Sequence, residues 1–209
     1  MSKYYETRFN FNQKRNSVWL AIVEYIQKFV EIDDVVLDVG SGYCDFINNI
    51  ECKKKFALDI NNESSLFCNQ DVFFINSTVN DLSLISNNSI DIIFASNLLE
   101  HLNDIILDQT ISEFYRVLRL NGKVILMQPN FKYAFSDYFD DYTHVKIFTH
   151  ISLVDFMNSK GFVNIKLIPK FLPLTLKSKL PKSYWLTKLY LLSPFKPFAK
   201  QMFGVFIKK

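Results

Sequence analysis

The sequence predicts a doubly wound α/β fold built on a mostly parallel sheet. Short apolar runs of strand length recur along the chain, segments with helical spacing of apolar residues lie between them, and the first apolar run ends at a glycine. Strands that alternate with helices form βαβ units, which bury a parallel sheet between two layers of helices. A chain of 209 residues has room for one such domain.

The first part of the chain supplies a helix and four strands. A helix is predicted over residues 17–30, because four apolar residues lie four positions apart: Val18, Ile22, Ile26 and Val30. Short apolar runs predict strands at 35–39, 55–60, 72–76 and 90–96.

The middle of the chain supplies a second helix and a fifth strand. The helix is predicted from one apolar face, made of Leu107, Ile111, Phe114 and Leu118. Asn121-Gly122 is expected to end this helix, because both residues tolerate the left-handed backbone of a helix terminus. The fifth strand follows at 123–129.

The last third completes a seven-stranded sheet. A helix around 149–160 is capped by Gly161 and leads into a strand at 162–168. Residues 203–209 are expected to pair antiparallel with that strand. We therefore predict one domain over 1–209, with a helical N-terminal cap at 1–34 and an insertion at 169–201.

Charge is distributed unevenly. Residues 156–209 hold eleven lysines and no acidic residue, whereas residues 1–155 hold all 21 acidic and 13 basic residues, a formal charge of −8. This asymmetry indicates an anionic partner for the tail, either a membrane surface or a polyanion, or else a tail that complements an acidic body. Residues 184–193 are predicted to form a short amphipathic helix in which lysine accompanies Trp and Leu. That composition fits an interfacial membrane anchor, a substrate lid or a dimer face.

Composition excludes several classes. Hydrophobic residues make up 49% and charged residues 22%, which excludes a mainly disordered chain. The cysteines, Cys44, Cys52 and Cys68, form no C-x-x-C pair, so we expect no disulfide framework, zinc knuckle or other metal site. No apolar run approaches the ~18 residues of a membrane-spanning helix. We expect a cytoplasmic protein, with a peripheral position at the inner membrane face as the alternative.

Two strand ends predict a nucleoside-binding site. The first strand ends in Asp38-Val39-Gly40-Ser41-Gly42, whose glycines allow a tight turn and a close ligand approach. The second strand ends at Asp59, nineteen residues beyond Gly40, where a carboxylate can accept both ribose hydroxyls. A glycine turn followed by this acid predicts a nucleoside cofactor.

The residues around the turn argue against a dinucleotide. The third glycine of G-x-G-x-x-G is replaced by Asp45, and Asp38 precedes the turn, so two carboxylates would repel a pyrophosphate. S-adenosylmethionine instead carries a cationic sulfonium, a cationic ammonium and a ribose. Carboxylates at Asp38 and Asp59 suit that ligand.

The chain resembles the class I S-adenosylmethionine-dependent methyltransferases, whose fold is Rossmann-like. VVLDVGSGYC is similar to their glycine motif, SIDIIFASNLLEHL (89–102) to their fourth-strand motif and YRVLRLNGKVILMQPN (115–130) to their fifth-strand segment. Cys44 departs from the third glycine of the motif, and Thr78 stands where many members have an acid facing the adenine. The resemblance implies S-adenosyl-L-methionine as cofactor and the following binding residues: Asp38, Gly40, Ser41, Gly42, Asp59, Ile60, Ser77, Thr78 and Asn97. Arg8 or Arg15 is expected to bind the methionine carboxylate.

Methyl transfer to a hydroxyl benefits from a general base, and three residues are candidates. His101 follows the fourth strand, and Asp141 and His144 follow the fifth. We favour His144, whose tyrosine-rich surroundings (Tyr133, Tyr138, Tyr142) could form a substrate wall. His101 has helix-entry packing as an alternative role, and His150 is expected to be a cap or surface residue.

The acceptor is argued partly by exclusion. Enzymes of this class that methylate nucleic-acid amino groups carry an N/D-P-P-Y/F loop after the fourth strand, whereas this chain has Ser96-Asn97-Leu98-Leu99 there. YYETRFNFNQKRNSVW and FLPLTLKSKLP resemble segments of methyltransferases from surface-polysaccharide pathways. The resemblance implies O-methylation of a saccharide or lipid-linked glycan, without a nucleic-acid partner. The alternatives are a small-metabolite or RNA methyltransferase, or a non-catalytic cofactor-binding partner of a glycosyltransferase.

Overall fold

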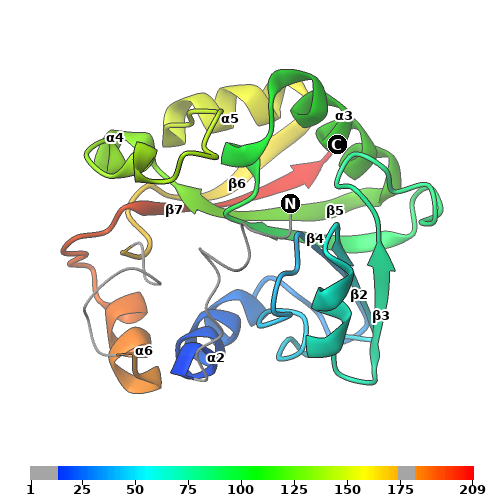
Figure 1. Ribbon diagram of the computed structural model, residues 1–209, viewed down its shortest axis with the longest axis horizontal. Coiled ribbons are helices and arrows are strands. Elements are labelled where there is room, and N and C mark those ends of the chain that lie inside the picture. The colour runs from blue at the N-terminus through cyan, green and yellow to red at the C-terminus, as the bar shows by residue number, and fades with distance from the viewer. Residues whose placement is uncertain (1–13, 174–181) are drawn as a thin grey trace.

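A seven-stranded sheet forms the centre of the protein (Figure 1). The computed structural model describes residues 14–173 and 182–209. The strands run in the order β3-β2-β1-β4-β5-β7-β6. Their bounds are Val35–Val39 (β1), Lys54–Asp59 (β2), Val72–Asn76 (β3), Ile90–Ser96 (β4), Leu118–Pro129 (β5), Phe162–Ile168 (β6) and Gln201–Lys208 (β7). The first five strands are parallel, and β7 is antiparallel to both β5 and β6, as predicted.

Helices cover both faces of the sheet (Figure 1). On one face lie α3 (Asp104–Val117) and α5 (His150–Ser159), and on the other lie α2 (Lys14–Gln27) and α6 (Tyr184–Leu192). A hydrophobic core lies on each face of the sheet, and alternate residues of β1 belong to the two cores. Leu37 packs on the α3 side and Val36 on the α2 side. Burial on both faces explains why these strands appear in the sequence as continuous apolar runs.

Shorter helices follow the strand ends near the predicted site. They are η1 (Asn62–Phe67) after β2, η2 (Leu99–His101) after β4, and α4 (Phe131–Ala134) and η3 (Tyr138–Asp140) after β5. Thr149 caps α5 through a reciprocal hydrogen-bonded pair with Ser152, and Gly161 adopts a φ of +87° just beyond its end. The glycine after α5 was predicted from the sequence, whereas the capping box at its start was not.

The boundary between α3 and β5 differs from the prediction. The helix ends at Val117, and Leu118 already belongs to β5, so Asn121-Gly122 lies inside the strand and does not end the helix. Asn121 has a φ of +65°, and the pairing of β5 with β4 shifts register between Ile90 and Ile92. The two residues that tolerate a left-handed backbone thus form an irregularity within the strand, because Leu118 is drawn into the buried sheet.

The C-terminal lysines are largely engaged within the fold. Lys160, Lys188 and Lys200 pair with Asp108, Glu24 and Asp137, which belong to the acidic part of the chain. Lys208 is buried and donates to the carbonyl oxygens of Tyr115 and Leu118. Much of the tail's positive charge therefore complements the acidic body. Among the described residues, no helix is long and apolar enough to cross a membrane.

Candidate active site

The order of the strands reverses at the carboxyl ends of β1 and β4, where α/β sheets bind ligands in a crevice. The chain passes from β1 outward to β2 and β3, then returns to β4 on the other side of β1. Loops on either side of such a switch point separate and leave room for a ligand. The glycine turn follows β1 and the Asn97–His101 segment follows β4, so both predicted motifs border this crevice.

The glycine turn has the backbone that its sequence demands. Gly40 and Gly42 adopt φ values of +72° and +53°. A Cβ atom at residue 40 would lie 3.2 Å from Cδ1 of Leu98, closer than ordinary van der Waals contact. The amides of Gly40 and Ser41 both donate to the carbonyl oxygen of Leu58, which ties the turn to the end of β2.

Cys44 occupies the place of a third glycine and adopts a glycine-like conformation. Its φ is +58°, in the left-handed region that a non-glycine residue rarely occupies. Its side chain is fully buried, with Sγ 3.0 Å from Sγ of Cys68 and 3.6 Å from the carbonyl oxygen of Ser64. A small side chain packed against η1 therefore replaces the hydrogen of glycine without a change of turn.

Asp59 ends β2 with both carboxylate oxygens held by backbone amides. The amide of Gly42 donates to Oδ2 and that of Asn61 to Oδ1, each at 2.8 Å. The side chain is only 3% exposed, which fixes its direction at the strand end. The next residue, Ile60, is 45% exposed and offers an apolar surface beside this carboxylate.

Negative charge accumulates below the glycine turn. Burial raises the pKa of Asp38 well above its usual value, and the carboxylates of Asp59 and Asp45 raise it further. Asp45 is paired with Arg15, whose Nη2 lies 2.8 Å from Oδ2 and whose guanidinium stacks 5.0 Å from the ring of Tyr43. Arg15, an expected partner of a ligand carboxylate, thus has a carboxylate within the protein, and Arg8 lies outside the described residues.

The remaining predicted cofactor residues lie at neighbouring strand ends. The amide of Ser77 donates to the carbonyl oxygen of Asp59 at 3.3 Å, which places the residues after β3 beside Asp59, and Thr78 is exposed. Asn97 has a φ of +49°, and its Oδ1 accepts from Nε2 of Gln201 at 2.8 Å. The structure therefore brings the residues after β1, β2, β3 and β4 to one edge of the sheet.

A second polar group lies after β4 and β5. Nδ1 of His101 lies 2.9 Å from Oγ1 of Thr143, which in turn donates to Oδ1 of Asp141 at 2.7 Å. Nδ1 of His144 lies 2.6 Å from the carbonyl oxygen of Tyr138. Because a carbonyl only accepts, and the Thr143 hydrogen already points to Asp141, both Nδ1 atoms carry the ring proton. The lone pair of each neutral imidazole is therefore on Nε2.

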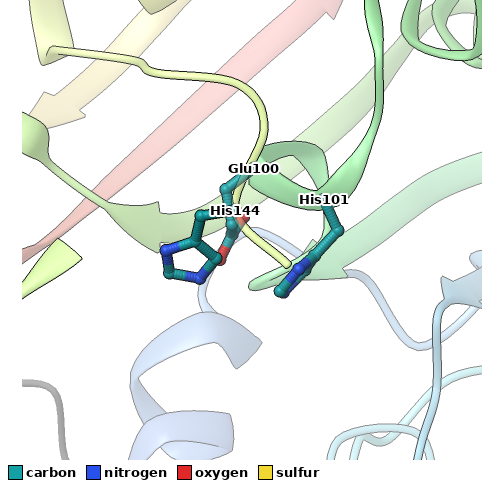
Figure 2. Close-up of side chains that lie close together, drawn as sticks. All are labelled: Glu100, His101 and His144. Atoms are coloured by element: carbon teal, nitrogen blue, oxygen red, sulfur yellow. The ribbon is translucent and has the colours of Figure 1, made fainter. Parts of the chain in front are cut away.

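Glu100 completes this group and was not predicted from the sequence. Its side chain is 2% exposed, and neither carboxylate oxygen has a hydrogen-bond partner. Figure 2 shows the Glu100 side chain behind His144, with its carboxylate on the side that faces His101. The Glu100 carbonyl also accepts from the amides of Val145 and Lys146, which holds the His144 loop against η2.

The predicted tyrosine wall does not form. Tyr138 is buried and donates to the carbonyl oxygen of Lys146, whereas Tyr142 is 74% exposed. Tyr133 stacks on His150, the first residue of α5. Tyr138 instead contacts His144, through its carbonyl oxygen and through a ring contact with centroids 4.6 Å apart.

Comparison with known proteins agrees with this geometry. Residues 37–126 match the family model described as a methyltransferase domain. This segment holds the glycine turn, Asp59 and η2. This part of the chain is a methyltransferase domain.

Solved methyltransferases share the fold of the whole chain at low identity. An S-adenosylmethionine-dependent methyltransferase from Archaeoglobus fulgidus is 20% identical with a TM-score of 0.70, covering 100% of this chain and 98% of its own. A chain of the Haloferax volcanii Trm112 methyltransferase activator complex is 12% identical with a TM-score of 0.68, at 92% and 90% coverage. A methyltransferase from Mesorhizobium loti is 10% identical with a TM-score of 0.65, at 90% and 98% coverage. The comparison with curated proteins finds no match.

The residues at the crevice fit S-adenosyl-L-methionine, the cofactor of this domain. Asp59 can accept the ribose hydroxyls with the remaining lone pairs of a carboxylate that is already fixed in place. The protein does not fully balance the charge of its buried carboxylates. The ammonium and sulfonium of the cofactor would supply the missing positive charge. Gly40 keeps the turn close to Leu98, which a larger residue would displace.

Proposed function

We propose that this methyltransferase transfers the methyl group of S-adenosylmethionine to a hydroxyl oxygen of a saccharide or lipid-linked glycan. The tautomers of His101 and His144 carry the proposal, because both rings are held with a basic Nε2 after β4 and β5. The bond from sulfur to the methyl carbon breaks as the bond from oxygen to that carbon forms. The hydroxyl proton passes to Nε2 of His144, and the sulfonium becomes the thioether of S-adenosylhomocysteine.

His101 and Asp141 are assigned positioning roles in this reaction. Asp141 is buried and orients the Thr143 hydroxyl, which accepts the Nδ1 proton of His101. The two imidazole rings lie with centroids 4.9 Å apart. A base fixed in this way is worth about 10²–10⁴-fold in rate, and alignment of the reacting atoms supplies much of the remainder.

The lipid-linked class of acceptor is supported by an exposed apolar surface. We define the α6 face as Trp185, Leu186, Leu189 and Leu192, each more than half exposed, together with Phe195 and Phe198 beyond the helix. Lys188 and Lys196, which lie beside this face, are engaged with Glu24 and with backbone carbonyl oxygens. We therefore propose that the face contacts the inner membrane surface through apolar insertion, with a smaller electrostatic contribution than eleven lysines suggested.

Methyl transfer from radiolabelled cofactor tests the acceptor class. Purified protein and labelled S-adenosylmethionine are added to a cell extract, which is then separated into lipid-saccharide, RNA, protein and small-molecule fractions. Label in the lipid-saccharide fraction, lost in His144→Gln and retained in His150→Gln, is the expected result. Label confined to RNA, protein or small molecules would replace the glycan by that class of acceptor, and binding of cofactor without any labelled product would favour a non-catalytic partner.

A further inference from the structure

We infer that Glu100, His101 and His144 form a binding site for a divalent transition-metal ion. Each residue offers one ligand atom, and these atoms all lie within 4.8 Å of one another (Figure 2). The residues are adjacent in η2 or come from the loop that Glu100 itself anchors. This site goes beyond the proposed methyl transfer, and it departs from the sequence-based expectation that the chain binds no metal.

The state of Glu100 is the first argument. The Glu100 carboxyl is 2% exposed, and within the described part of the chain neither of its oxygens has a hydrogen-bond partner. Such a group is costly to bury, so it is normally paired or bound to a cation. A bound cation would remove the cost by replacing the missing partner.

The orientation of the two histidines is the second argument. Histidines that bind metals usually donate the other ring N–H to a carbonyl, carboxylate or similar acceptor, which fixes the tautomer. His144 donates from Nδ1 to the Tyr138 carbonyl, and His101 donates to the Thr143 hydroxyl that Asp141 orients. In this tautomer the lone pair of each ring is on Nε2, the atom that would bind the metal.

The spacing requires a contraction of the site. Ligand atoms at ~2.1 Å from an ion are at most ~4.2 Å apart, and about 3.4 Å apart in a tetrahedral arrangement. The ligand atoms of this cluster lie within 4.8 Å of one another, so the widest pair must close by up to roughly 1.4 Å when a tetrahedral ion binds.

The ligand types indicate the class of metal. Two imidazoles and one carboxylate suit Zn²⁺ and neighbouring ions such as Co²⁺ and Fe²⁺ better than Mg²⁺ or Ca²⁺, which prefer oxygen ligands. Three protein ligands leave positions open for oxygen atoms, such as a hydroxyl of the acceptor, whose pKa the ion would lower. In that case the ion, and not a direct contact with His144, would activate the acceptor hydroxyl.

Titration with Co²⁺ tests the site without acceptor or cofactor. Protein dialysed against a chelator is titrated with Co²⁺ while the visible absorption of the ion is recorded, and Zn²⁺ is then added as a competitor. We expect one equivalent bound, with the absorption of a histidine-ligated ion of low coordination number, and displacement by Zn²⁺. Failure of the folded wild-type protein to bind either ion would overturn the inference.

Variants assign the ligands. His144→Gln and Glu100→Gln are each expected to weaken binding by about 100-fold or more, because loss of a second-sphere partner alone costs ~10–100-fold. Thr143→Val should fall within that smaller range. His150→Gln is the matched control, since His150 is the third of the three histidines and is not part of the cluster. Unchanged affinity in folded Glu100→Gln and His144→Gln would place the ion elsewhere and contradict the proposal.

The outcome is separable from that of the proposed function. Metal binding is measured without any acceptor, so its absence leaves methyl transfer intact, with His144 as the direct base. Bound metal without any labelled product would instead leave the site standing and remove the proposed O-methylation.

Discussion

Buried carboxylates dominate the site at the scale of single residues. Asp38, Asp45 and Asp59 lie together at the ends of β1 and β2, and Arg15 forms an ion pair with Asp45. Like charges in a buried site oppose one another, so this site favours a cationic ligand. The protein should therefore bind S-adenosylmethionine more tightly than its neutral thioether product. The ratio of these two affinities should be smaller in a variant that lacks one carboxylate.

Asp38→Asn tests this stored charge through pH. The folded pKa of Asp38 is raised above the unfolded value of 3.8, so its contribution to stability is complete below that pH and is lost as pH rises through the folded pKa. We expect the cofactor-free variant to lose this pH-dependent destabilisation. Its Tm at neutral pH should rise by about 2–4 °C for each kcal/mol by which the free energy of unfolding increases. Thermal unfolding of both proteins from about pH 4 to pH 8 measures this difference.

Cofactor binding by the same variant supplies the contrast. Asp38→Asn should bind S-adenosylmethionine more weakly while its affinity for S-adenosylhomocysteine changes less. A wild-type protein whose stability shows no fall on the alkaline side, or a variant with the same pH profile, would contradict the buried-charge account.

Asp59→Ala tests the ribose contact. Two hydrogen bonds to a charged group contribute about 1.5–3 kcal/mol each, so affinity for S-adenosylhomocysteine should fall by at least ~10-fold in calorimetric titration. Asp71→Ala is the matched control, because Asp71 is an exposed aspartate just before β3 that forms an ion pair with Lys55. An unaltered affinity in folded Asp59→Ala would remove the assignment.

At this scale the sequence predicted those site residues that can be recognised from the residues next to them in the chain. Gly40, Gly42 and Asp59 were recognisable because each ends a strand or forms its turn. Glu100 was missed because its burial depends on a loop more than forty residues away, which a local pattern does not reveal. The Thr143 bridge between His101 and Asp141 was hidden for the same reason.

At the scale of elements, β7 is the most constrained strand. It lies between β5 and β6 and pairs with both, so it is an interior strand although it is distant from β6 in sequence. Seven of its eight residues are buried, all but Ile207. Its removal would expose the apolar core on both faces and leave β6 without a partner.

Deletion of residues 200–209 should therefore abolish folding. We expect the truncated protein to be insoluble, or to lack a cooperative unfolding transition, because an interior strand contributes more than the few kcal/mol that separate folded from unfolded chains. Solubility, circular dichroism and cofactor binding measure it. A soluble truncation that binds S-adenosylhomocysteine would contradict the role of β7.

The α6 face makes an independent prediction. Trp185→Ser combined with Leu189→Ser should abolish flotation with anionic liposomes, since apolar insertion drives the proposed contact. Wild-type flotation should persist at about 0.5 M salt, which screens charges beyond a few ångströms. Leu66→Ser is the matched control, because Leu66 is 81% exposed on η1, outside the α6 face. Equal flotation of the double variant and the wild type would exclude this face.

At the scale of the whole molecule, the strand and helix pattern was sufficient for the fold. Continuous apolar runs identified the five parallel strands, because a sheet covered on both faces leaves little room for polar residues. The strand β6 was predicted from alternating residues, and β7 as its antiparallel partner. The largest error in the elements, the start of β5, arose where helix and strand share a boundary with no polar turn between them. The lysines of the tail could be counted from the sequence. Their ion-pair partners could not be predicted, because these depend on which acidic residues the fold brings beside Lys160, Lys188 and Lys200.

The interior position of β7 also bears on how the chain is made. During synthesis β5 emerges well before residues 201–208, and β6 emerges before the strand that must separate the two. Until β7 arrives, the open edge of β5 can pair wrongly with β6 or with a neighbouring nascent chain. The sheet therefore remains incomplete while residues 130–200 are translated, and the length of this segment sets how long the edge of β5 is open to wrong pairing.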